Sequence, residues 1–162
     1  MQGDRKPGKG NGRVCQVLRD LDDEQASLVG EADPRVRATV PMSPGLWYAF
    51  GASGEGLADL AEPFVLAGGR DTILSWSGEA RPAWQAMGGP KRLALFQDVG
   101  HYGFSFLCEV LPNFQPECEG PAGGWAELSW VHDRSQALVA AFLGLTMMDD
   151  GRYAAWLESD DS

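Results

Sequence analysis

The sequence predicts an α/β fold in which about three parallel strands are flanked by helices. Short apolar runs alternate with amphipathic helical segments, and this order favours parallel strand pairing. The apolar run at residues 63–68 is continuous rather than alternating, as in strands that are covered on both faces. The chain of 162 residues has 44% apolar residues, which is the size and composition of one domain with a core.

The first half of the chain contains a tail, a helix and a strand. Residues 1–13 are polar and rich in glycine, so we expect a flexible tail. Residues 14–30 place apolar side chains on one face and acidic ones on the other, which predicts a helix that ends at Gly30. Residues 36–42 are β-branched and apolar, which predicts the first buried strand.

The second half contains two strands and three helical segments. Residues 63–68 are the second predicted strand, and residues 93–96 are the third. Between them, residues 76–88 space large apolar side chains for one helical face and stop at Gly-Gly-Pro. Residues 128–148 predict a long amphipathic helix, and residues 151–158 add a final helical turn or two.

Three strands make a thin sheet with bare edges. We therefore expect residues 14–158 to be a partial α/β domain that belongs to a larger sheet, followed by a frayed acidic end at residues 159–162. On its own, such a domain is expected to be marginally stable or to associate with itself.

Charge and hydropathy exclude several classes of function. The net charge is −10, which disfavours binding to nucleic acid because phosphates require a basic face. No run of about 18 apolar residues is present, so we expect no membrane span. The basic residues near the N-terminus are not followed by an apolar stretch, and the chain is therefore expected to carry no signal peptide.

Asp71 and His101 follow neighbouring predicted strands. Asp71 comes after two glycines that end residues 63–68, and His101 comes after Gly100, beyond residues 93–96. The carboxyl ends of parallel strands meet in one crevice, where catalytic groups collect. An Asp beside a His supplies two members of a Ser-His-Asp triad. The alternative for Asp71 is a turn or helix-cap residue.

Metal binding is the other chemistry that these residues suggest. The chain has only two histidines, His101 and His132, and their spacing with Asp71 matches no metal motif. We therefore expect no metal and no cofactor.

Several motifs in order resemble the C-terminal half of α/β-hydrolases, closest to the dienelactone hydrolase and platelet-activating-factor acetylhydrolase-like branch. They are DPRVRA (33–38) running into MSP (42–44), FVLAGGRD (64–71), VGH (99–101), and GHYGFSFLCE (100–109) followed by Cys118, an amphipathic helix and DGRYAAWL (150–157). The resemblance covers roughly residues 13–158. It implies that Asp71 is the triad acid, that His101 is the general base, and that the substrate is a small or lipid-like ester. It also slightly favours an exported or periplasmic location.

The nucleophile that the resemblance requires is not evident. In this family it lies in a Gly-x-Ser-x-Gly elbow upstream of the acid. Ser53, in GASGEG (51–56), is a near miss because position 55 is Glu, no apolar strand leads into it and no strong helix follows. Ser43 lacks the leading glycine, and Ser75 and Ser77 come after the acid. Ser53 stays a weak candidate, and we expect the chain to begin after the elbow.

The three cysteines leave one unpaired after any disulfide. Cys108 and Cys118 are ten residues apart around two prolines, which fits a small disulfide-closed loop if the protein is exported. The alternative is a pair of ordinary thiols in a cytosolic chain.

Five aromatic residues near predicted loops are candidates for lining an apolar acyl or lipid pocket, namely Trp47, Tyr48, Phe50, Trp125 and Trp130. Packing beneath the loops is the alternative for each of them.

The expected function is therefore the C-terminal portion of a serine ester hydrolase, inactive without its nucleophile and completed by an N-terminal half. The alternative is a non-catalytic α/β module that binds or associates, through the crevice or through the exposed edge of residues 36–42.

Overall fold

The computed structural model describes residues 33, 35–51, 53–111, 113, 118 and 124–158. The expected tail, the helix expected at residues 14–30 and the expected frayed end lie outside the described residues.

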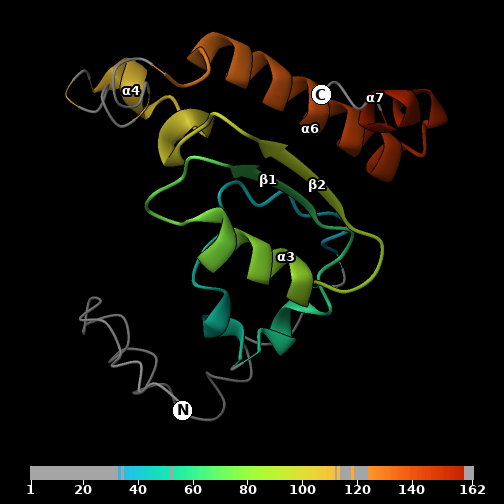
Figure 1. Cartoon of the computed structure of the whole chain (residues 1–162). Coiled ribbons are helices and arrows are strands. Elements are labelled where there is room, and N and C mark those ends of the chain that lie inside the picture. The colour runs from blue at the N-terminus through green and yellow to red at the C-terminus, as the bar shows by residue number, and fades with distance from the viewer. Residues whose placement is uncertain are drawn as a thin grey trace, which may run out of the picture. The chain divides into compact units, whose positions relative to one another are not determined.

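Two parallel strands form the sheet of the described chain, β1 (Phe64–Gly68) and β2 (Arg92–Phe96) (Figure 1). Phe64 pairs with Arg92, and Gly68 pairs with Phe96. All five residues of β1 are buried, as its continuous apolar sequence predicts. Both strands lie where the sequence places them, to within one residue.

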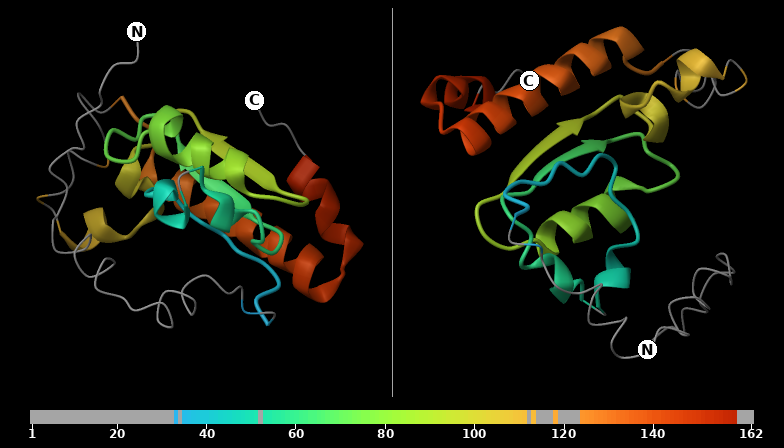
Figure 2. Two further views of the ribbon diagram at one scale, coloured as in Figure 1. Left: turned by 90° about the horizontal axis from the view of Figure 1, so that it is seen from below. Right: turned by 180° about the vertical axis from the view of Figure 1, so that it is seen from behind.

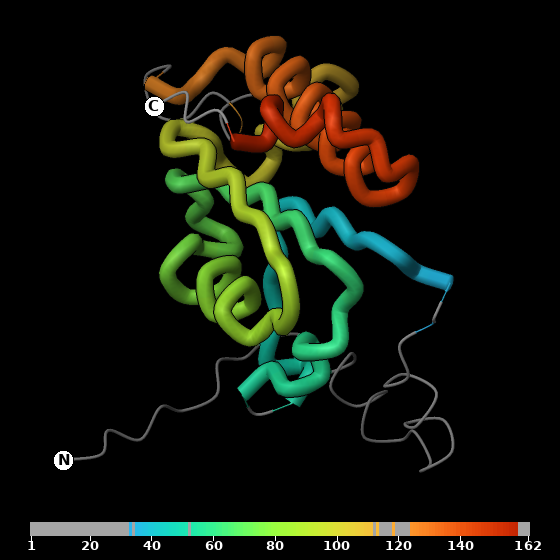
Figure 3. The backbone as a smooth tube through the Cα atoms, turned by 90° about the vertical axis from the view of Figure 1, so that its right-hand side faces the viewer, coloured from blue at the N-terminus to red at the C-terminus, as the bar shows by residue number. Residues whose placement is uncertain are grey.

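The strand predicted at residues 36–42 is not a regular strand. This segment runs parallel to β1 on the edge away from β2, and makes two isolated bridges, Thr39 with Pro63 and Met42 with Leu66 (Figure 3). The Leu66 N–H donates to the Pro41 carbonyl at 3.0 Å, and the Ser43 N–H donates to the Leu66 carbonyl at 2.8 Å. The same pattern one step earlier would need an N–H from Pro41, and proline has none. The ladder therefore breaks, and the sheet has two strands and one extended segment.

Helix α3 (Arg81–Ala86) covers one face of the sheet. It continues a π-helical turn, η3 (Trp76–Ala80), so the helix predicted at residues 76–88 has two parts. The Ser75 hydroxyl caps this start by accepting the Gly78 N–H at 3.2 Å. Ala80, Ala83 and Met87 pack with the β1 side chains that point to this face.

Helix α6 (Leu128–Met148) covers the opposite face and confirms the predicted helix at residues 128–148. Its Val131 and Phe142 are buried against Phe64, Leu66 and Phe96. The sheet therefore lies between α3 and α6, and the views from below and from behind show the same layers (Figure 2).

After α6 the chain turns back through η7 (Gly151–Tyr153) into α7 (Ala154–Glu158). No helix among the described residues is long and apolar enough to cross a bilayer.

Phe142 tests the packing between α6 and the sheet. Its ring is 2% exposed and lies 5.2 Å from the ring of Phe64. Phe142→Ala is expected to lower the free energy of unfolding by about 3–5 kcal/mol, because it removes buried area and leaves a cavity. Phe106→Ala is the matched control, since Phe106 is 57% exposed. Equal losses in chemical denaturation of the two variants would contradict this packing.

Candidate active site

Asp71 and His101 meet at the carboxyl ends of β1 and β2. Asp71 follows β1 through a two-residue turn, and His101 is the first residue of the 3₁₀ turn η4 (His101–Phe104), which follows β2. Asp71 Oδ2 and His101 Nδ1 are 2.9 Å apart. The structure thus brings together the two residues that the sequence singled out as acid and base.

Glycines between the strand ends make this approach possible. The Gly69 N–H donates to the Phe96 carbonyl at 2.8 Å, and the Arg70 N–H donates to the Val99 carbonyl at 3.0 Å. A Cβ at Gly69 would lie 2.5 Å from the carbonyl oxygen of Gln97. The turns after β1 and β2 therefore lie in contact along their backbones, and this contact sets the position of Asp71 relative to His101.

The Asp71 carboxylate is buried and uses both of its oxygens. Oδ1 accepts the backbone N–H groups of Ile73 at 2.9 Å and Leu74 at 2.7 Å, while Oδ2 faces His101. The side chain is only 1% exposed. Asp71 is therefore a turn residue, as the alternative predicted, and the same turn holds its second oxygen toward the imidazole.

His101 is partly open to solvent, with 23% of its side chain exposed. A carboxylate only accepts hydrogen bonds, so a neutral imidazole must carry its proton on Nδ1 toward Asp71. The lone pair then lies on Nε2, which has no hydrogen-bond partner among the described residues. That atom is free to take a proton from a reacting group, as a general base does.

Aromatic rings pack against the imidazole and against the glycine that precedes it. The ring of Tyr102 meets the imidazole edge-on at a centroid distance of 5.0 Å. Gly100, the preceding residue, lies against the indole of Trp125, where a Cβ would come within 2.1 Å of the ring. The Ala126 N–H, next to Trp125, donates to the Asp98 carbonyl at 2.7 Å and ties this segment to the turn after β2.

An open hollow lies beside Asp71. It has a volume of about 590 Å³ and is lined by Gly69, Arg70, Asp71, Thr72, Gly124 and Trp125. Arg70 Nε pairs with Asp98 Oδ1 at 3.1 Å, and both side chains are more than half exposed. Trp125 is the predicted aromatic candidate that lines this hollow. Arg70 and Thr72 also line the hollow, although the sequence did not single them out. Their only signal in the sequence is that they are adjacent to Asp71.

Ser53 makes its hydrogen bonds away from His101. It lies between the short turns η1 (Trp47–Phe50) and η2 (Glu55–Leu57). Its hydroxyl donates to Glu55 Oε2 at 3.1 Å, and Gly54 beside it packs near Ala86 of α3. This arrangement does not support Ser53 as the nucleophile.

Ser43 lies at the same edge of the sheet as Asp71, which its sequence context did not reveal. Its backbone is left-handed, with φ of 44°, and its buried hydroxyl has no hydrogen-bond partner among the residues that the structure describes. It makes no bond to His101. In the described part of the chain, no serine or cysteine side chain is hydrogen-bonded to that histidine.

The structure joins Cys108 and Cys118, whose Cα atoms are 6.4 Å apart, within the range of disulfides. Cys108 belongs to the short helix α4 (Leu107–Val110), which follows η4 closely. The bond therefore restrains the segment directly after His101.

His132 lies apart from this pair. It is buried on α6, and its Nδ1 is 3.3 Å from Glu109 Oε1. Within the described residues, no cluster of His, Cys, Asp and Glu suits a metal ion.

The turn after β1 provides a test of how the pair is positioned. Gly69→Ala is expected to destabilise the fold by about 1–3 kcal/mol, because the new methyl group meets backbone atoms of Gln97 that cannot rotate away. Gly151→Ala is the matched control, since a Cβ there meets nothing within 4 Å. Thermal unfolding of both variants checks this, and an unaffected Gly69→Ala would contradict the close approach of the strand ends.

Comparison of the chain with protein-family models and with curated proteins finds no match.

Proposed function

We propose that this chain supplies the acid and the base of a serine ester hydrolase of the α/β-hydrolase type. The observation that carries the proposal is the 2.9 Å contact between Asp71 Oδ2 and His101 Nδ1, at the ends of two adjacent parallel strands. No described residue forms a hydrogen bond with His101 Nε2. The motifs that resemble dienelactone hydrolases point to the same pair.

In the proposed reaction, His101 Nε2 takes the proton of a serine hydroxyl as that oxygen attacks the ester carbonyl. The imidazolium that forms is stabilised by the buried Asp71 carboxylate, which stays ionised. The same Nε2 then returns the proton to the leaving alcohol, and a water molecule repeats the sequence to release the acid. The serine and the oxyanion-hole donors are proposed to come from a complementing N-terminal segment.

The proposed substrate is a small or lipid-like neutral ester. The indole of Trp125 offers an apolar surface in the hollow beside Asp71. The net charge of −10 gives an anionic ester no long-range attraction.

A second candidate is an association module without catalysis. It is favoured by the edge of residues 36–42, where Val36 and Met42 are 47% and 43% exposed. The backbone hydrogen bonds that pair this segment with the described part of the sheet go to β1. A strand from another chain would extend the sheet on that side.

The test compares ester hydrolysis by two samples, using p-nitrophenyl butyrate. One is the purified 162-residue chain, and the other is the chain co-produced with the polypeptide encoded directly upstream of it. The proposal predicts a rate at the buffer level for the first and turnover that depends on His101 for the second. Buffer-level rates in both samples would overturn the proposed esterase function and favour the association module.

A further inference from the structure

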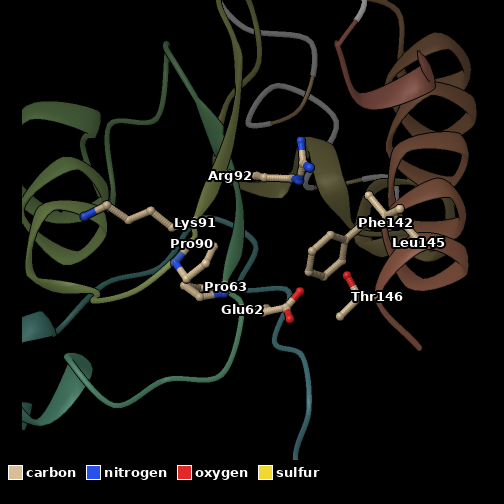
Figure 4. Close-up of a pocket in the computed structure, with 8 residues that line it drawn as sticks. All are labelled: Glu62, Pro63, Pro90, Lys91, Arg92, Phe142, Leu145 and Thr146. Carbon is tan, nitrogen blue, oxygen red and sulfur yellow. The ribbon is translucent and has the colours of Figure 1, made fainter. Parts of the chain in front are cut away.

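A second hollow lies at the opposite end of the sheet from Asp71 and His101, where the strands begin. It has a volume of about 310 Å³ and lies between the strand starts and the last turns of α6 (Figure 4). The lining residues are Glu62, Pro63, Pro90, Lys91, Arg92, Phe142, Leu145 and Thr146. The volume is at the lower end of the range of small-molecule sites, about 300–1,000 Å³.

Two side chains of opposite charge, Arg92 and Glu62, line this hollow. Figure 4 shows the Arg92 guanidinium and the Glu62 carboxylate on the sheet side, above and below the ring of Phe142 in that view. Among the described residues, no hydrogen bond or ion pair engages either side chain. Both groups are therefore available to a ligand.

The neighbouring cation, Lys91, is engaged elsewhere. Its Nζ donates to the carbonyls of Trp84 and Met87, each at 2.8 Å, and lies 4.7 Å from the ring centroid of Trp84. Figure 4 shows this side chain turned toward α3. The hollow thus presents one free cation and one free anion from the described chain, rather than a general patch of positive charge.

The wall opposite the charges is apolar. Phe142 is buried with its ring against Phe64, and Leu145 lies one turn onward with the hydroxyl-bearing Thr146. On the charged side, Glu62 has a left-handed backbone, with φ of 30°, directly before the buried Pro63. A non-glycine residue held in that conformation is often part of a functional site.

We propose that this hollow binds a small zwitterion with an apolar side chain, of the class of the aliphatic amino acids. The carboxylate pairs with the Arg92 guanidinium, whose planar fork suits it, and the ammonium group pairs with Glu62. The aliphatic chain lies against Leu145, beside the part of Phe142 that reaches the hollow. This site goes beyond the proposed hydrolase function and does not depend on it.

The test is a titration of the ¹⁵N-labelled 162-residue chain with L-leucine, followed through its amide NMR signals. The proposal predicts saturable shifts at Glu62, Arg92 and Thr146. It also predicts that 4-methylpentanoate, which lacks the ammonium group, and 3-methylbutylamine, which lacks the carboxylate, each bind roughly tenfold more weakly or worse.

Variants separate the site from nonspecific binding. Arg92→Gln and Glu62→Gln are each expected to weaken leucine binding roughly tenfold. Arg35→Gln is the matched control and should retain binding, because Arg35 pairs with Asp33 and does not line the hollow. His101→Ala also retains it, so this result is independent of the esterase test. The proposal is overturned by the absence of saturable shifts up to the solubility limit of leucine, by equal binding of the three ligands, or by native-like binding to Arg92→Gln.

Discussion

His101→Ala is expected to lower ester turnover by the complemented enzyme by about 10⁴-fold or more, because the substitution removes the group that takes and returns the proton. The effect should fall on kcat, while KM changes little, since the imidazole acts mainly in the transition state. Initial rates with p-nitrophenyl butyrate over a range of concentrations measure both constants.

The matched control is His132→Gln, which removes the other histidine of the chain. His132 is buried on α6 beside Glu109 and does not contact the pair. This variant should retain most of the turnover of the native enzyme, provided that circular dichroism shows it folded. If only His132→Gln lost turnover, His132 rather than His101 would be the base.

Asp71→Asn is expected to lower kcat by about 10⁴-fold while leaving the fold intact. The asparagine oxygen can still accept the N–H groups of Ile73 and Leu74, which Asp71 Oδ1 accepts now. The amide nitrogen would take the place of Oδ2 and donate to His101 Nδ1. The imidazole would then carry its proton on Nε2 and could not act as a base.

Asp98→Asn is the matched control for the loss of one carboxylate at this end of the sheet. Asp98 pairs with Arg70 on an exposed surface and does not touch His101. Its substitution should change kcat by less than about twofold, since exposed ion pairs contribute little. A similar loss of kcat in both variants would mean that Asp71 acts only through overall charge.

The strands and the long helix could be predicted because one simple pattern dominates each. The continuous apolar run before Asp71 gives β1, and the helical spacing of apolar side chains gives α6. The break in the ladder beside β1 was missed, although its cause, Pro41, is visible in the sequence. The β-branched residues of 36–42 predicted a full strand, whereas the missing N–H of Pro41 leaves only isolated bridges.

The candidate site was predictable in part. Asp71 and His101 could be placed at one sheet edge because parallel strands end together, and the structure brings their side chains into contact. The Ser43 backbone, with its positive φ, has no comparable signal in the sequence. The same is true of the hollow between Glu62 and Arg92, since it depends on side chains thirty positions apart that meet only after the sheet forms.

The most direct measurement is the tautomer of His101 in the purified 162-residue chain, by long-range ¹H–¹⁵N NMR at a pH where the imidazole is neutral. His132→Gln leaves one histidine ring and assigns the signals. We predict a protonated Nδ1 and an unprotonated Nε2, with the two exchanged in Asp71→Asn. A proton on Nε2 in the native chain, or no change in Asp71→Asn, would contradict Asp71 as the group that positions the base.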